Sequence, residues 1–168
     1  MRSRRSALLL LASLVLVALV SAWWYPQLPE VVASHFNGSG VADGWMSKDM
    51  FFLVMALAGV GSALCVAGGA WIVRVVDPSR LNLPNKDYWL APQRREQALD
   101  RMQSLLLQYS WVTVVGVAAC LHLVASTNLM PEPVLPNGPF LAGLAAYLLY
   151  TAVWLAWLLV GFRKPLSA

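Results

Sequence analysis

The side chains that could do chemistry gather in the polar stretch that follows the first apolar segment. His35, Asp43, Glu30 and Asp49 supply an imidazole and three carboxylates, the groups that hold metal ions and transfer protons. A metal site needs three or four converging ligands, and this spacing matches no zinc motif. A metal-dependent or proton-responsive site would therefore require His35 and Asp43 to meet the other histidine, His122. In the simpler alternative, His35 hydrogen-bonds to Asp43 within the stretch, and His122 bonds to a helix neighbour.

No second reactive set accompanies these groups in the sequence. There is no further Ser/His/Asp or Cys/His set that could converge, no phosphate-binding glycine loop, and no paired carboxylates within an apolar segment. We therefore expect no catalytic residue and no cofactor, and a protein that is not an enzyme.

Four long apolar segments must position the polar stretch. They cover residues 7–24, 51–76, 102–125 and 140–162 of a chain that is 59% hydrophobic. A bilayer core of about 30 Å needs roughly 20 apolar helical residues, and each segment is near that length. The sequence thus predicts one all-α membrane domain over residues 1–168, a four-helix bundle with a small hairpin-like extracytoplasmic loop.

The basic residues predict which side each loop faces. Eleven of the twelve fall on one side of the segments, and only Lys48 falls on the other. The eleven are Arg2, Arg4, Arg5, Arg74, Arg80, Lys86, Arg94, Arg95, Arg101, Arg163 and Lys164. The positive-inside rule then places both termini and the loop 77–101 in the cytoplasm, and the loops 25–50 and 126–139 outside. We expect a multi-pass protein of the bacterial inner membrane that contacts anionic lipid headgroups at its cytoplasmic face and binds no nucleic acid.

The first apolar segment has a second interpretation, as a cleaved signal peptide. Ser3-Arg4-Arg5 suits the basic start of such a peptide, and Val20-Ser21-Ala22 suits its cleavage site. The apolar run is longer than the usual 7–15 residues or so, however, and Trp23 and Trp24 suit a membrane interface. These features favour a retained span.

The loop 25–50 has the pattern of a compact hairpin. Val31 to Phe36 is a β-prone run, Asn37-Gly38 predicts a hairpin turn, and Asp43-Gly44 predicts a second turn. We expect Phe36 and Trp45 to form the core of this hairpin. Ser47 is placed to cap the second span.

The same loop resembles a family of membrane domains. The pattern is Tyr25-Pro26, Leu28-Pro29, His35-Phe36-Asn37, Gly40, Asp43-Gly44-Trp45 and Lys48, directly after a first span. It is similar to a bacterial membrane domain of unknown function, best known from the N-terminal half of immunity proteins against the secreted sporulation-delaying toxin. The resemblance implies a multi-pass cytoplasmic-membrane protein in immunity or envelope sensing. The residues expected to bind an outside protein or peptide are His35, Phe36, Asn37, Asp43, Trp45 and Lys48.

The loop 77–101 offers a second candidate surface. Pro84 prevents a continuous helix over residues 82–90, whereas the residues after Pro92 should run unbroken into the third span. The loop is expected to be mainly a solvated extension of that helix with a membrane-adjacent turn. The alternative is a docking face for a cytoplasmic partner, with the candidate residues Lys86, Tyr88, Trp89, Arg94 and Arg95.

Small and polar residues predict how the spans pack. Gly61, Cys65 and Gly69 share one face of the second span, which predicts that this face lies inside the bundle, with homodimerisation through it as the alternative. Gln108, Tyr109, Ser110 and Thr113 form a polar patch in the third span that is expected to join helices.

These features favour a membrane protein that senses or binds an envelope component through the loop 25–48. A structural or accessory subunit of a membrane complex is the alternative. A metal-dependent membrane enzyme that uses His35, Asp43 and His122 is a third.

Overall fold

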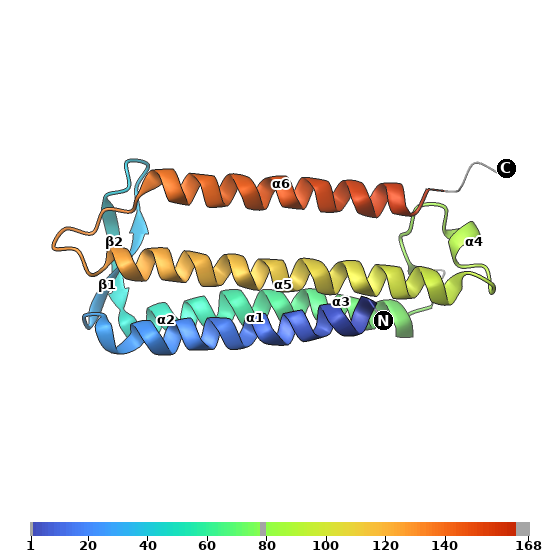
Figure 1. The fold of residues 1–168 in the computed structure, drawn as a ribbon, viewed down its shortest axis with the longest axis horizontal. Coiled ribbons are helices and arrows are strands. Elements are labelled where there is room, and N and C mark those ends of the chain that lie inside the picture. The colour runs from blue at the N-terminus through green and yellow to red at the C-terminus, as the bar shows by residue number, and fades with distance from the viewer. Residues whose placement is uncertain (1, 78–79, 164–168) are drawn as a thin grey trace.

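The computed structural model describes residues 2–77 and 80–163 (Figure 1). The chain makes four long helical passes, so that the first and the last helix have their outer ends, the start of α1 and the end of α6, at the same end of the bundle. Lys164, one of the basic residues after the fourth span, lies outside the described residues. The elements are α1 (Arg2–Trp24), the 3-10 turn η1 (Tyr25–Gln27), β1 (Val31–Phe36), β2 (Ala42–Ser47), α2 (Lys48–Ala56), the π-helical turn η2 (Leu57–Gly61), α3 (Ser62–Val75), α4 (Lys86–Trp89), α5 (Arg95–Thr127) and α6 (Asn137–Gly161).

Four helical segments are long and apolar enough to cross a membrane. They are Arg4–Gln27, Lys48–Val75, Arg95–Thr127 and Asn137–Gly161. The all-α fold with a small two-stranded antiparallel hairpin is therefore confirmed, and the chain has the architecture of a multi-pass membrane protein. Two of the expected loops are shorter than predicted, because α2 already begins at Lys48 and α6 at Asn137.

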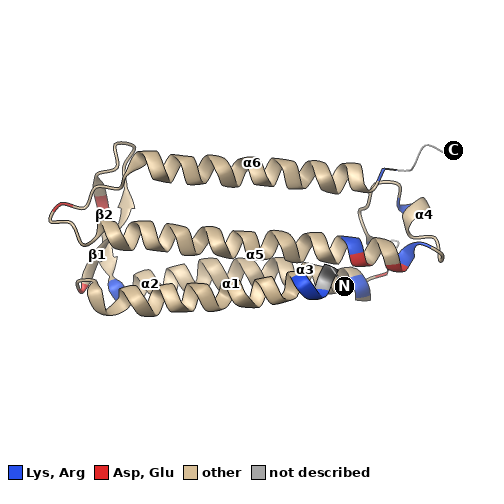
Figure 2. Cartoon of the chain, in the orientation of Figure 1, with Lys and Arg blue, Asp and Glu red and all other residues tan. Residues whose placement is uncertain are grey.

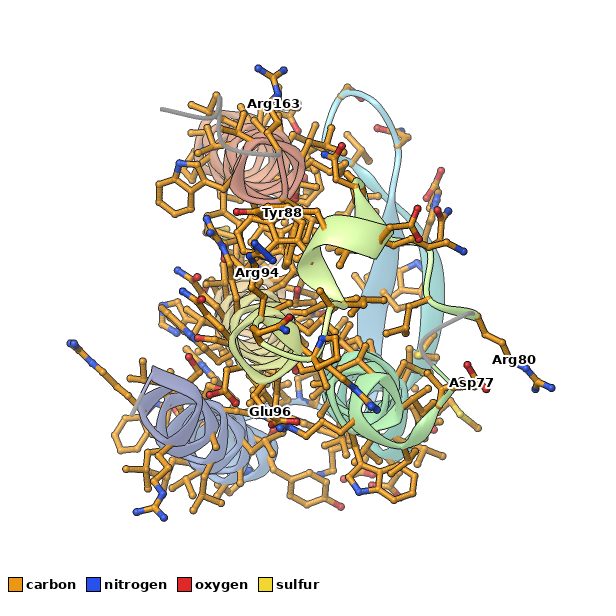
Figure 3. The ribbon with its side chains drawn as sticks, turned by 90° about the vertical axis from the view of Figure 1, so that its right-hand side faces the viewer. Asp77, Arg80, Tyr88, Arg94, Glu96 and Arg163 are labelled. Atoms are coloured by element: carbon orange, nitrogen blue, oxygen red, sulfur yellow. The ribbon has the colours of Figure 1, made fainter. Side chains whose placement is uncertain are left out.

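The helix α5 is the centre of the bundle. α1 and α3 pack closely along it, and α6 lies along its other side with much less contact (Figures 1 and 3). Val114, Ala118 and Leu121 of α5 are buried in this packing, whereas α6 buries none of its residues. The bundle is thus a tight three-helix unit with a fourth helix applied to one side.

Polar side chains join these helices, as the sequence predicted. The Ser110 hydroxyl is fully buried and donates to the carbonyl oxygen of Ala63 in α3 at 3.2 Å. The Thr113 hydroxyl lies 2.9 Å from that of Tyr147 in α6, and Tyr109 is hydrogen-bonded to the same tyrosine at 3.1 Å. These bonds fix α3 and α6 to α5 inside the apolar part of the bundle.

The prediction that Gly61, Cys65 and Gly69 face the bundle interior is wrong. Cys65 is exposed, and a Cβ atom added at either glycine would meet nothing within 4 Å. The cause is the π-helical turn η2, which inserts one extra residue and rotates the helix that follows it. In a continuous α-helix with 3.6 residues a turn, positions 62 and 69 would face the same side as the buried Phe51 and point inward. Ala63 and Ala70, one residue later, are the buried ones.

The hairpin lies at one end of the bundle, and α4 at the other. β1 pairs with β2 in antiparallel register, from Val31 opposite Ser47 to Phe36 opposite Ala42. The predicted hairpin is confirmed, but its turn spans residues 37–41. Gly40 adopts the left-handed conformation (φ +84°), and the Asn37 side-chain oxygen accepts the N–H groups of Ser39 and Val41. The second predicted turn is absent, since Asp43-Gly44 lies within β2 at a register irregularity.

Charge divides between the two ends of the bundle (Figure 2). Lys48 is the only Lys or Arg at the hairpin end among the described residues, and the others lie towards the α4 end. There Arg74 of α3 donates to three side chains of α5, which are Gln103 at 3.0 Å, Glu96 at 3.2 Å, and Asp100. This cluster fastens α3 to α5 at the charged end.

Candidate functional site

The hairpin is fastened to the bundle by Asn128, the residue that follows α5. Its side-chain oxygen accepts the backbone N–H of Ala33 at 2.6 Å, and its NH₂ group donates to the carbonyl oxygen of Ala33 at 2.9 Å. Both residues are buried. Asn128 therefore acts as a short extra strand beside β1 and fixes the position of the whole hairpin. This role of Asn128 cannot be read from the sequence, because an Asn after a helix is also an ordinary cap.

The turn of the hairpin is held by the segment between α5 and α6. The Leu135 N–H donates to the carbonyl oxygen of Gly40 at 2.8 Å, and Val41 forms a β-bridge with Val134. A Cβ atom at Gly40 would lie 2.5 Å from the Leu135 carbonyl oxygen. Position 40 thus requires glycine both for its positive φ and for this close approach.

The base of the hairpin is closed by a polar cluster at the start of α2. Lys48 donates from Nζ to Glu30 Oε1 at 2.8 Å, and its ammonium group lies 5.0 Å from the centre of the Tyr25 ring. The Tyr25 hydroxyl donates to Asp49 Oδ1 at 2.7 Å. Ser47 accepts the Met50 N–H with its hydroxyl, which confirms the predicted helix cap. Lys48 is therefore part of the structural base, and its side chain is only 15% exposed.

The two histidines do not meet. His35 Nδ1 lies 2.5 Å from Asp43 Oδ1 across the hairpin, and His122 Nδ1 accepts the indole N–H of Trp24 at 3.2 Å. The described residues contain no group of three His, Cys, Asp or Glu side chains that could hold a metal ion. The geometry agrees with the simpler alternative from the sequence, in which His35 pairs with Asp43 and His122 with a helix neighbour.

Trp45 is not part of the hairpin core, contrary to the prediction. Residues of β2 alternate, so that Asp43, Trp45 and Ser47 face outward. Trp45 is 54% exposed, and the side chains of His35 and Asp43 are 74% and 45% exposed. Phe36 instead packs against the buried cluster beneath the hairpin, as predicted for a core residue.

Gly44 allows the exposed pair to form. A Cβ atom at this position would lie 2.8 Å from the Cβ of His35, its partner on the opposite strand. The absence of a side chain lets the imidazole lie across the strand and reach Asp43. We name the exposed set His35, Asp43 and Trp45 the outward face of the hairpin.

The candidate docking residues at the α4 end are partly occupied within the chain. The Trp89 indole N–H and the Asn85 side chain both donate to the carbonyl oxygen of Phe162, at 2.8 and 2.9 Å, which caps the end of α6. Trp89 is 9% exposed as a result. Lys86 is exposed at the start of α4.

The remaining candidates at this end surround Tyr88. The Arg94 guanidinium lies 4.0 Å from the centre of the Tyr88 ring, and the two side chains are adjacent in Figure 3, where Arg80 and Arg163 point away from the bundle. Arg95 is half-buried, and its Nε finds no acceptor among the described residues. The α4 end thus combines a docked aromatic turn with freely projecting arginines.

One part of the chain is similar to a known family of domains. No curated protein and no solved structure matches the chain significantly. Residues 12–59 match the family model described as a domain of unknown function (DUF1648). This range takes in most of α1, the whole hairpin and α2, so the outward face lies inside the matched region. The similarity therefore covers part of the first span, the hairpin and the start of the second span.

Proposed function

We propose that this chain is a binding or sensing protein of the bacterial inner membrane, and that it recognises a protein or peptide from the cell envelope through the outward face of the hairpin. The binding set is His35, Asp43 and Trp45. The hairpin end faces outside, and the α4 end faces the cytoplasm, where its arginines contact anionic lipid headgroups. The distribution of basic residues supports this orientation, because positive charge is retained on the cytoplasmic side.

One observation carries the proposal, which is the division of labour within the hairpin. Asn37, Gly40 and Lys48 serve the turn and the base of the hairpin. His35, Asp43 and Trp45 contribute their side chains to the surface. An exposed tryptophan beside an imidazole and a carboxylate is the composition of a recognition surface, since tryptophan is enriched among residues that dominate binding energy.

The resemblance of this loop to the immunity domain supports the same role. Such proteins would meet a secreted peptide on the outer side of the cytoplasmic membrane. In the proposed orientation, the outward face of the hairpin lies on that side. Immunity or envelope sensing is therefore the class of function that we assign.

The experiment compares what co-purifies with the wild-type chain and with the Asp43→Ala/Trp45→Ala variant from the native membrane. We expect the variant to lose a specific partner while its melting temperature stays within about 2 °C, since surface substitutions usually change stability by less than about 0.5 kcal/mol. A control is Asn137→Ala, a half-buried position at the start of α6 that lies at the same end but outside the outward face, which should retain the partner.

A structural variant separates recognition from folding. Asn128→Ala leaves the side chains of the outward face intact but removes the hydrogen bonds that position the hairpin. It should therefore lower the melting temperature and weaken the binding of the partner at the same time. The proposal is wrong if Asp43→Ala/Trp45→Ala keeps every partner of the wild-type chain, or if it unfolds as readily as Asn128→Ala.

An accessory subunit of a membrane complex is the second candidate. The observation in its favour is the exposure of α6. This helix packs mainly on α5, and none of its residues is buried. Its apolar surface would be covered by another subunit. This function predicts that the chain is unstable when expressed alone, whereas the recognition function predicts a chain that is stable without its partner.

A further inference from the structure

An apolar cleft separates α5 from α6 in the half of the bundle nearest the hairpin. Its volume is about 500 Å³, which is within the range of ligand sites of roughly 300–1,000 Å³. Residues of α5 between Thr113 and Leu123 and residues of α6 between Pro139 and Tyr147 line it. Small residues open it, and a Cβ atom at Gly143 would meet nothing within 4 Å.

The cleft is long and narrow, with polar groups at its two ends. Thr113 and Leu123 are ten residues apart on α5, which corresponds to about 15 Å along the helix. At the deep end, the hydroxyls of Thr113 and Tyr147 are hydrogen-bonded to each other. At the end near the hairpin lies His122. Between these ends the walls are aliphatic or aromatic, as an apolar chain requires.

His122 presents a hydrogen-bond donor at the shallow end of the cleft. Its Nδ1 accepts the indole N–H of Trp24, and an indole can only donate. In the neutral imidazole the proton therefore resides on Nε2. This atom makes no hydrogen bond with the described residues, although the ring lines the cleft and is exposed. An N–H donor left without a partner at the edge of the hydrocarbon is costly, so an acceptor should be present there.

The depth of His122 matches the level of lipid ester groups. It lies five residues before the end of α5, about 7.5 Å along the helix. Its partner Trp24 ends α1 and belongs with Trp23 and Tyr25 to an aromatic group at the same level. Tryptophan and tyrosine mark the boundary between hydrocarbon and headgroups, where the ester carbonyls of glycerolipids lie.

We propose that the cleft binds one acyl chain of an ester-linked glycerolipid, and that the ester carbonyl oxygen accepts a hydrogen bond from His122 Nε2. The acyl chain lies along α5 towards Thr113 and covers the face of α6 that the bundle leaves open. A second copy of the protein fits less well. The backbone carbonyls of a spanning helix are already engaged, and the exposed large side chains of α6 in this half, Phe140, Leu141 and Leu144, offer no acceptor.

Native mass spectrometry of the purified full chain tests this site with two probes. One is a diester phosphatidylglycerol, and the other is its diether analogue, which lacks the carbonyl oxygens. The wild-type chain should hold one diester molecule about fivefold more tightly than the diether, the change expected from one hydrogen bond. In His122→Phe, which keeps an aromatic ring beside Trp24, the two probes should bind equally.

A second pair of variants tests the cleft itself. Gly143→Phe fills it and should lower the affinity for the diester at least tenfold. Gly69→Phe introduces the same side chain on the open surface of α3 and should bind like the wild-type chain. Equal binding by Gly143→Phe and Gly69→Phe would overturn the proposal. So would equal wild-type affinity for the two probes, or a dimer that Gly143→Phe dissociates, since a second copy would then be the occupant.

Discussion

At the scale of single residues, Asn128 is the position on which the hairpin most depends. Its amide makes two hydrogen bonds to the backbone of Ala33, and both residues are buried. Asn128→Ala leaves a buried donor and a buried acceptor without partners, each costing about 1–3 kcal/mol. We expect a loss of about 2–4 kcal/mol in the free energy of unfolding, measured by thermal unfolding in detergent. Asn137→Ala, whose side chain makes one long bond to Gly38 at 3.5 Å, should change little.

Two glycines of the turn form a matched pair for a second prediction. Gly40 has a positive φ, and its added Cβ would lie 2.5 Å from the Leu135 carbonyl oxygen. Gly38 has open space around it. Gly40→Ala should therefore destabilise the chain by about 1–3 kcal/mol, and Gly38→Ala by much less. Thermal unfolding measures both, and equal effects of the two substitutions would contradict the assignment of the turn.

At the scale of elements, the π-helical turn η2 determines which face of the second span is buried. It makes Ala63 an interior residue and Cys65 an exposed one. Ala63→Leu should therefore destabilise the chain by about 1–3 kcal/mol, because the buried position has no room for a larger side chain. Cys65→Leu, on the exposed surface of the same helix, should change stability little. Thermal unfolding in detergent measures both, and a larger loss for Cys65→Leu than for Ala63→Leu would show that the span is a continuous α-helix.

This element also marks where prediction from sequence fails. The spans follow from hydropathy alone, because a bilayer demands length and apolar composition. The strands were predicted from a β-prone run and a turn pattern, and the helix-capping role of Ser47 from its place just before the second span. The inward face of α3 could not be predicted from the sequence. The one-residue insertion at the π-helical turn that rotates this helix does not alter its composition. The role of Asn128 depends on tertiary proximity to Ala33, which local patterns do not encode.

The candidate site was predicted only in part, because local sequence patterns do not determine the strand register. His35 and Asp43 form a pair, as the simpler sequence interpretation expected. The outward position of Trp45 depends on strand register, and an irregularity at Gly44 alters that register. Such an irregularity cannot be placed from residue types alone.

At the scale of the whole molecule, the separation of charge leads to a prediction of orientation. Arg80 and the hairpin residue Ser39 are both exposed, and they lie at opposite ends of the bundle. In a Cys65→Ser/Cys120→Ser background, an impermeant maleimide applied to whole cells should label Ser39→Cys. Arg80→Cys should react only after the cells are opened. The reverse pattern would invert the proposed topology and place the outward face of the hairpin in the cytoplasm.

In the proposed function, a rigidly held hairpin presents His35, Asp43 and Trp45 to a partner outside the membrane. The most direct measurement replaces Trp45 with a photo-reactive benzophenone amino acid and illuminates intact cells. A matched probe at Trp71 of α3, which is 63% exposed on the apolar surface, serves as the control. We predict one defined protein or peptide adduct at position 45 that disappears when His35→Ala is added, and only lipid adducts at position 71. Identical adducts at both positions, or a position-45 adduct that persists in His35→Ala, would contradict the account.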